Sequence, residues 1–203
     1  MATRSTRLAY RAVAKRKARV SLLARGGGDV KRQVEFQVTG DDPQTRLVRT
    51  FDAPMEIVFM AWTTADMLRR WYGPHVTTVS ECFMDLTEGG SYRITMRAPD
   101  GTEYPMFGTV HNIRVPYHFE LVVDLSEHPD DFVHLFRPLG TALEFVPVRW
   151  YYEIDLREEQ GVTTAEVLAR YPVVEDRDVM ISTGGSIGWN ESFERLDALL
   201  AQF

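Results

Sequence analysis

Histidine and aspartate side chains, which can hold metal ions or move protons, gather in one short stretch of this 203-residue sequence. His128 and His134 flank Asp130 and Asp131, and a divalent ion favours such a mixture of imidazole and carboxylate groups. The stretch has no repeated ligand spacing and no predicted rigid support. We therefore interpret it as a solvated acidic turn and predict no metal site. The single cysteine, Cys82, follows a strand pattern beside apolar residues and is expected to be a small buried residue.

The sequence holds no recognisable catalytic motif. A nucleophile elbow, a phosphate-binding loop, a zinc-protease signature and a metal-binding loop are all missing from it. His111 follows the alternation of Phe107 and Thr109 and could face an interior cavity, but a general base there would need a carboxylate or a desolvated setting. We predict no catalytic residue and no cofactor, and we expect that the chain is not an enzyme.

Bulky side chains on two predicted strands and at the end of a predicted helix suggest a binding surface. Aromatic rings with hydroxyl or indole tips suit a mostly apolar ligand that carries a few polar groups. Tyr92, Tyr152, Arg93 and His111 are the candidates for orienting such groups. The candidate ligand-binding residues are Trp71, Tyr72, Tyr92, Ile94, Met96, Phe107, His111, Trp150, Tyr152, Met180, Gly184, Gly185 and Gly188. An ordinary hydrophobic core is the competing interpretation of the same pattern.

The elements that would position these residues follow a simple order. Alternating apolar and polar residues predict strands over 33–38, 45–51, 76–86, 91–97, 103–113, 118–125, 148–156 and 163–171. Two short helices are predicted over 52–62 and 63–71, and a long helix begins near Asp176. Short hairpin connections indicate one antiparallel sheet, and only the last helix is long enough to cover it.

Three glycines interrupt this last helix, and each costs roughly 1 kcal/mol relative to alanine in a helix interior. Gly184, Gly185 and Gly188 lie between bulky residues such as Met180 and Phe193. A helix that is bare at one point can either approach the strands closely or leave a cavity above them. Both interpretations remain open, and the ligand-binding hypothesis depends on the cavity.

Charge divides the chain into a basic head and an acidic body. Residues 1–40 hold ten of the 23 Lys and Arg residues but only two of the 29 acidic ones. We predict a flexible basic extension over 1–40 and one domain over 41–203. The acidic body argues against nucleic-acid binding by the domain.

The head has three interpretations. A disordered tail, an organellar transit peptide over 1–28, and an arm that touches polyanions or membranes all fit its Arg-rich, acid-poor composition. Its apolar run is too short for a secretory signal, and no apolar run in the sequence is long enough to span a membrane. A single cysteine fits a reducing compartment, so a cytoplasmic location is expected, with an organelle as the alternative.

Three stretches resemble signatures of a known superfamily, in the same order. They are RTFDAPMEIVFMAWTTADMLRRWYGP (49–74), DLTEGGSYRITMRAPDGTEYPMFGTV (85–110) and EDRDVMISTGGSIGWNESFERLDALL (175–200). They are similar to the START-like (SRPBCC) superfamily, and within it to the branch named after the C-terminal domain of the activator of heat-shock protein 90 ATPase. The resemblance implies an α+β helix-grip fold, in which a curved antiparallel sheet wraps around a long C-terminal helix and encloses a cavity.

The favoured function is non-catalytic binding of a small hydrophobic or aromatic molecule, such as a lipid or polyketide, between sheet and helix. Two alternatives come from the resemblance: a chaperone-cofactor module with a role in the stress response, and an enzyme similar to polyketide cyclases and aromatases. The segment 126–148 is longer than the usual connection in that superfamily. It is either a lid over the cavity or a packed loop without a functional role.

Overall fold

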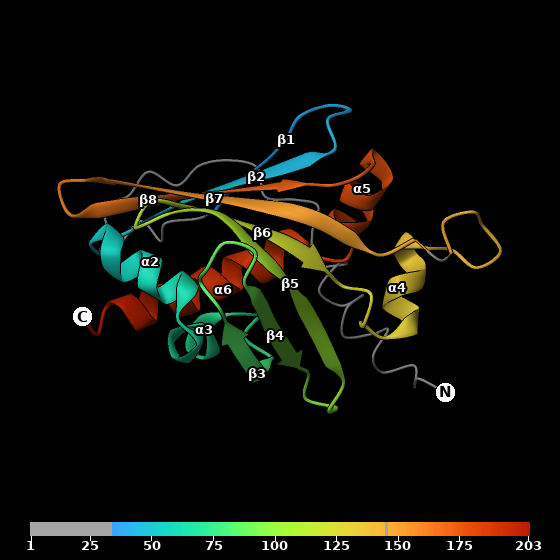
Figure 1. Cartoon of the computed structure of the whole chain (residues 1–203), viewed down its shortest axis with the longest axis horizontal. Coiled ribbons are helices and arrows are strands. Elements are labelled where there is room, and N and C mark those ends of the chain that lie inside the picture. Colours follow the sequence, from blue (N-terminus) through green and yellow to red (C-terminus); the bar gives the residue numbers. More distant parts are fainter. Residues whose placement is uncertain (1–33, 145) are drawn as a thin grey trace, which may run out of the picture.

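The computed structural model describes residues 34–203 except residue 145, and one antiparallel sheet dominates it (Figure 1). Its spatial order is β1-β2-β8-β7-β6-β5-β4-β3. The strands are β1 (Glu35–Val38), β2 (Gln44–Phe51), β3 (Thr78–Met84), β4 (Ser91–Arg97), β5 (Glu103–Arg114), β6 (His118–Asp124), β7 (Arg149–Glu159) and β8 (Val162–Arg170). Each predicted strand from 33–38 to 163–171 is therefore confirmed. Residues 1–33 of the basic head, on which its three interpretations depend, lie outside the described residues.

Helices cover the concave side of the sheet and one of its ends (Figure 1). They are α2 (Met55–Thr63), α3 (Ala65–Trp71), α4 (Asp130–Phe136), α5 (Val174–Ser182) and α6 (Gly185–Leu200). The first two are the predicted short pair. Figure 1 shows α6 crossing under the strands, with α2 and α3 beside one half and α4 and α5 at the other end.

The core lies between the inner face of the sheet and α2, α3 and α6. Alternation on β2 turns Leu47 and Phe51 inward, and α6 contributes Phe193 and Leu196, all with at most 1% of their surface exposed. Arg49 shares that inner face of β2 and forms an ion pair with an aspartate of α6. The sheet thus has one apolar side, and α6 covers it.

The predicted single long helix is divided into two. Gly184 adopts the left-handed conformation with φ of +92°, which ends α5, and its carbonyl accepts the first hydrogen bonds of α6 from Ile187 and Gly188, both at 3.0 Å. Glycine tolerates this conformation because it has no Cβ, and a left-handed residue commonly ends a helix. One of the three glycines therefore serves a break in the helix.

The sheet also begins earlier than the boundary predicted at residue 41. β1 pairs with β2 over four register positions, from Glu35 opposite Val48 to Val38 opposite Thr45. The alternation in 33–38 was sufficient to indicate this edge strand. The change in charge near residue 40 therefore does not coincide with the start of the fold.

Candidate functional site

Aromatic side chains from two strands meet on the inner face of the sheet. Tyr92 and Ile94 on β4, and Trp150 and Tyr152 on β7, are all buried. The Tyr92 hydroxyl donates to the carbonyl of Val122 at 3.0 Å. The strand alternation seen in the sequence thus placed these four predicted residues on the same side.

The end of α3 closes over this surface. The Trp71 indole donates to the carbonyl of Ala61 at 2.8 Å, and the Tyr72 hydroxyl contacts the sulfur of Met106 at 3.2 Å. Met96, on the inner face of β4, packs under Gly73, where a Cβ would come within 2.9 Å of its sulfur. These predicted residues belong to one packed wall.

Trp189, on the first turns of α6, occupies the centre of that wall. Its ring lies 5.8 Å from Trp62, 6.0 Å from Tyr72 and 5.7 Å from Tyr152, measured between ring centroids. A helical side chain leans toward the turn that precedes it, so Trp189 covers the turn that begins at Gly185. Sequence reasoning did not include Trp189 among the site residues, although its spacing of four from Gly185 was a usable signal.

The other two glycines differ in how closely neighbouring atoms approach them. A Cβ on Gly185 would meet the carbonyl oxygen and the sulfur of Met180, each at 3.0 Å, whereas a Cβ on Gly188 would touch only Pro74, at 3.5 Å. Gly185 is therefore needed for the tight junction of α5 and α6. Gly188 has room for a methyl group.

A small pocket remains beside this junction. Its volume is about 10 Å³, which is room for one water molecule, and it is lined by Phe36, Thr45, Tyr171, Met180, Ile181, Gly185, Ser186 and Trp189. At this junction the described residues leave too little space for an organic guest in this conformation, because Trp189 lies where the hollow was expected. Of the predicted site residues, Met180 and Gly185 border the pocket.

The polar groups of the wall are buried in apolar surroundings. Burial raises the pKa of Tyr72 and of Tyr92 well above the ordinary value for a phenol. Burial also raises the pKa of Tyr152, an effect opposed by the indole groups of Trp150 and Trp189 that face its hydroxyl. Despite this proximity, the Trp150 N–H makes no hydrogen bond of good geometry within the described chain, and neither does that of Trp62.

Two predicted site residues lie on the opposite side of the sheet. Phe107 is the register partner of Arg93, whose guanidinium lies 5.4 Å from its ring centroid, and His111 is bonded to Glu88 at 3.0 Å. The strand alternation was recognised, but its phase was assigned wrongly, because Met106 and Val110 are the inward residues of β5.

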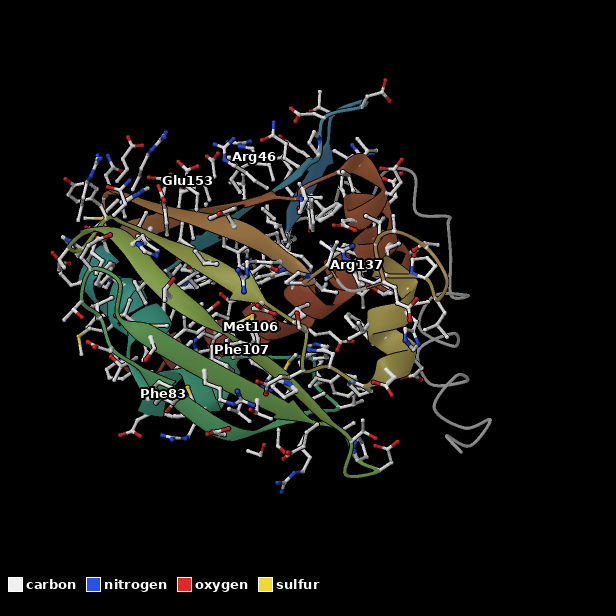
Figure 2. The ribbon with its side chains drawn as sticks, turned by 45° about the vertical axis from the view of Figure 1, so that its right-hand side comes forward. Arg46, Phe83, Met106, Phe107, Arg137 and Glu153 are labelled. Carbon is white, nitrogen blue, oxygen red and sulfur yellow. The ribbon has the colours of Figure 1, made fainter. Side chains whose placement is uncertain are left out.

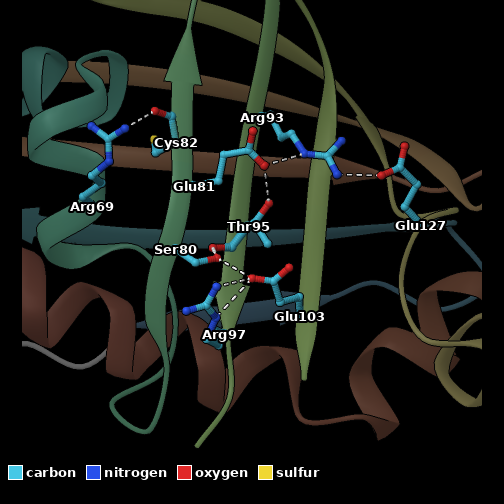
Figure 3. A network of polar contacts seen from close by, with 9 residues as sticks. All are labelled: Arg69, Ser80, Glu81, Cys82, Arg93, Thr95, Arg97, Glu103 and Glu127. Carbon is cyan, nitrogen blue, oxygen red and sulfur yellow. Dashed lines mark hydrogen bonds and ion pairs between the residues drawn. The ribbon is translucent and has the colours of Figure 1, made fainter. Parts of the chain in front are cut away.

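Arg93 is also on this outer face, where a polar network spans β3, β4 and β5 (Figure 3). Its guanidinium binds Glu81 at 2.9 Å and Glu127 at 2.6 Å. Arg97 in turn binds Glu103 at 2.7 Å. Arg93 and His111 therefore cannot orient a ligand held against α6 in this conformation.

The remaining residues considered for metal binding or catalysis are explained by where they lie in the fold. His128 is not part of a solvated turn: its ring lies between Tyr104 and Phe132, and burial lowers its pKa to about 4. Asp130 and Asp131 begin α4 on the exposed side. Cys82 is buried, and burial raises its thiol pKa to about 11, so the reactive thiolate is scarce at neutral pH.

The long segment 126–148 is packed against the domain. Phe136 of α4 is buried with its ring 5.9 Å from Trp150. Arg137 (Figure 2) donates to both carboxylate oxygens of Asp176 on α5, at 2.7 and 3.1 Å, and to the carbonyls of Val146 and Pro147. These contacts favour the packed-loop interpretation over a lid that swings freely.

An antiparallel sheet that grips a C-terminal helix on its apolar face defines a helix-grip domain of the START-like class. Within that class, the chain belongs to the Activator of Hsp90 ATPase homolog 1-like protein family, whose model matches residues 52–201. The resemblance noted in the sequence is thereby confirmed. No curated protein sequence matches the chain significantly.

Solved bacterial structures share the fold at low sequence identity. A Rhodobacter sphaeroides protein is 19% identical with a TM-score of 0.70, and the match covers 84% of this chain and 99% of that one. An Arthrobacter aurescens protein is 21% identical with a TM-score of 0.68, covering 83% and 92%. The AHSA1 protein from Silicibacter pomeroyi is 22% identical with a TM-score of 0.60, covering 78% and 98%. At this identity the likeness shows the fold alone.

None of the helices that the structure describes has both the length and the apolar character needed to cross a bilayer.

Proposed function

We propose that this domain binds a small, largely apolar aromatic molecule without chemical turnover, between the inner face of the sheet and α6. The ligand takes the place that the Trp189 indole occupies in the structure described here. The protein acts in the cytoplasm in this proposal, and its partner is the small molecule.

The observation that carries the proposal is a set of poorly satisfied donors beside Trp189 and Tyr152. The buried indole N–H groups of Trp62 and Trp150 make no hydrogen bond of good geometry in the described chain, although the Trp150 indole faces the Tyr152 hydroxyl. The hydroxyl of Tyr72 donates to a weak acceptor, the sulfur of Met106, at 3.2 Å. A buried donor without an acceptor costs about 1–3 kcal/mol, so a core built only for stability would avoid several together. A ligand with hydroxyl or carbonyl oxygens would satisfy them.

Binding requires Trp189 to move, and the local structure favours that. Trp189 and its neighbours from Thr183 to Asn190 are half-buried or exposed, whereas Phe193 one turn later is buried. The break at Gly184 separates this turn from α5, so the first turns of α6 can shift without carrying α5 along. The ligand then selects a minor open state, and its apparent affinity is reduced by the population of that state.

The test compares two tyrosine-to-phenylalanine variants on neighbouring positions of β7. Tyr152 is buried beside Trp189, whereas Tyr151 is 54% exposed on the outer face. Titration with 2-naphthol and with a hydroxylated anthraquinone, followed by tryptophan emission, should show saturable binding. Tyr152→Phe should weaken it about 10-fold for one lost hydrogen bond, and Tyr151→Phe should leave it unchanged.

Trp189→Ala provides the opposite test, because it removes the group that competes with the ligand. We expect it to bind the same compounds more tightly than the wild type does. Native mass spectrometry of the protein purified from its own host should also show a retained small-molecule mass. The proposal fails if neither the wild type nor Trp189→Ala binds any member of a broad lipid and aromatic library.

A chaperone-cofactor role is a second candidate, supported by the family name and by one surface. Leu135, Leu139, Leu143 and Val146 on the 126–148 segment are 44–64% exposed. Exposed apolar side chains that cluster commonly mark a protein contact. Stimulation of the ATPase of the host heat-shock protein 90, lost on Leu139→Ser, would favour this role over the small-molecule one.

A further inference from the structure

A group of acidic side chains and one histidine lies on the outer face of β6 and β7, away from the aromatic wall. His118 and Glu120 on β6 are the register partners of Asp155 and Glu153 on β7. Figure 2 shows Glu153 on the side of the sheet turned away from α6. We name these four residues the outer cluster.

Three residues of the outer cluster have ligand atoms close enough together for one metal ion to bind them. One ligand atom each from His118, Glu153 and Asp155 lie within 4.8 Å of one another. The Nδ1 atom of His118 is 2.9 Å from Asp155, and its Nε2 atom is 3.6 Å from Glu120. Two ligands of one Zn²⁺ ion, each at about 2.0–2.2 Å, are about 3.3–3.7 Å apart for angles near 110–120°.

The His118 ring is the observation that points to a bound cation. Its side chain is 8% exposed, and its Nε2 atom has no hydrogen-bond partner in the described part of the chain. A buried imidazole among three carboxylates is a donor set that suits a divalent transition-metal ion.

The charges of the outer cluster are only partly compensated. Glu153 forms an ion pair with Arg170 at 2.8 Å. Within the described chain, Glu120 accepts a hydrogen bond from the neutral amide of Asn112 at 2.9 Å and lies 3.6 Å from Nε2 of His118. Like charges directly opposite each other on neighbouring strands are unfavourable, and Glu120 lies opposite Glu153. A divalent cation would offset this repulsion.

We propose that the outer cluster is a binding site for a divalent transition-metal ion of the Zn²⁺ class. His118, Glu153 and Asp155 are its ligands, and water completes the coordination. Glu120 lies beside these ligands, 3.6 Å from Nε2 of His118, and its negative charge favours a cation. The three carboxylates are 31–37% exposed, which gives the ion a path from solvent.

The proposal is independent of the proposed ligand site, because it uses the opposite face of the sheet. The test is calorimetric titration of the full, untagged chain with ZnCl₂, together with the Co²⁺ absorption spectrum. We expect one saturable ion per chain, a loss of at least about 10-fold in affinity for His118→Gln, and a loss of about 10-fold for Asp155→Asn.

His75→Gln is the matched control, since His75 is an exposed histidine that contacts Glu194 at 2.9 Å. It should bind as the wild type does, and the melting temperatures of the metal-free variants should show that they fold. If His118→Gln does not fold, Glu153→Gln should show the same loss of affinity. Absence of saturable binding at millimolar ZnCl₂, or equal affinity in the wild type and the outer-cluster variants, would overturn the proposal.

Discussion

The two parts of the helical segment over residues 174–200 are held to the domain by different forces. The second half of α6 is held mainly by apolar contacts: Phe193 meets Phe51 at 5.6 Å and Trp71 at 6.3 Å between ring centroids, and both Phe193 and Leu196 are buried. One ion pair, from Arg49 to Asp197, adds to this packing.

α5 is held mainly by charged groups. Asp176 is bound bidentately by Arg137, and Arg177 donates to the carbonyls of Gly40 and Asp42 at 2.7 and 2.5 Å. Asp176, Arg177 and Arg137 are all nearly inaccessible to solvent, so these contacts replace the hydration that the charges lose.

The difference separates a region held by apolar packing from a region held by directional ion pairs. Apolar packing is nearly independent of direction and supplies most of the folding free energy, whereas buried ion pairs fix geometry and add little net stability. The half-buried turn around Gly184 and Trp189 lies between the two. Movement needed to admit a ligand would therefore be confined to that turn while α5 and the end of α6 stay in place.

Truncation of an aromatic residue in the apolar half should have the largest effect. Phe193→Ala should lower the free energy of unfolding by about 3–5 kcal/mol, because it removes a buried ring and leaves a cavity. Met180→Ala, at the edge of the small pocket, should cost less than about 2 kcal/mol. Urea denaturation followed by circular dichroism measures both. Equal losses would mean that the two regions share one continuous core.

Much of this apolar half could be predicted from the sequence. Period-two alternation identified each strand, and the alternation of Tyr92 with Ile94 and of Trp150 with Tyr152 placed four wall residues on the correct face. Helical spacing identified the apolar face of α6 through Phe193 and Leu196. These assignments succeeded because burial imposes a regular period on neighbouring residues.

The adjustable region could not be predicted in the same way. Whether a glycine leaves a void or permits a contact depends on which neighbour reaches it, and Trp189 and Met180 do so through the helix break. Which residues of β5 point inward was also ambiguous, because Phe107 and Val110 are both apolar. Only the folded structure shows that Val110 is the inward one. The outer cluster joins residues about 35 positions apart, a proximity that strand register creates.

Acid should weaken the region around α4 and α5 before it affects the apolar half. Burial lowers the pKa of His128 from 6.5 to about 4, so between these values the unfolded chain binds a proton that the folded chain excludes. The stability contributed by neutral His128 is complete above pH 6.5 and is lost as the pH falls toward 4. The full effect is on the order of 3 kcal/mol.

The variant His128→Phe isolates this contribution, since its ring can occupy the space between Tyr104 and Phe132 without titrating. The difference in unfolding free energy between the wild type and the variant, measured from pH 7 to pH 4, should grow in favour of the variant. A constant difference over that range would show that His128 is solvated, and would remove the contrast between a charge-sensitive and an apolar half.

The smallest effects should come from two identical substitutions at the helix junction. Gly184→Ala should cost about 1–2 kcal/mol, because alanine is strained at a φ of +92°. Gly188→Ala should instead stabilise the chain by about 0.5–1 kcal/mol, because the new methyl group makes an ordinary contact with Pro74 at 3.5 Å and removes the helix penalty of glycine. Thermal melting of the two variants compares them directly. If both substitutions stabilised the chain, the helix would have to be continuous through residue 184, and the two halves would move as one body.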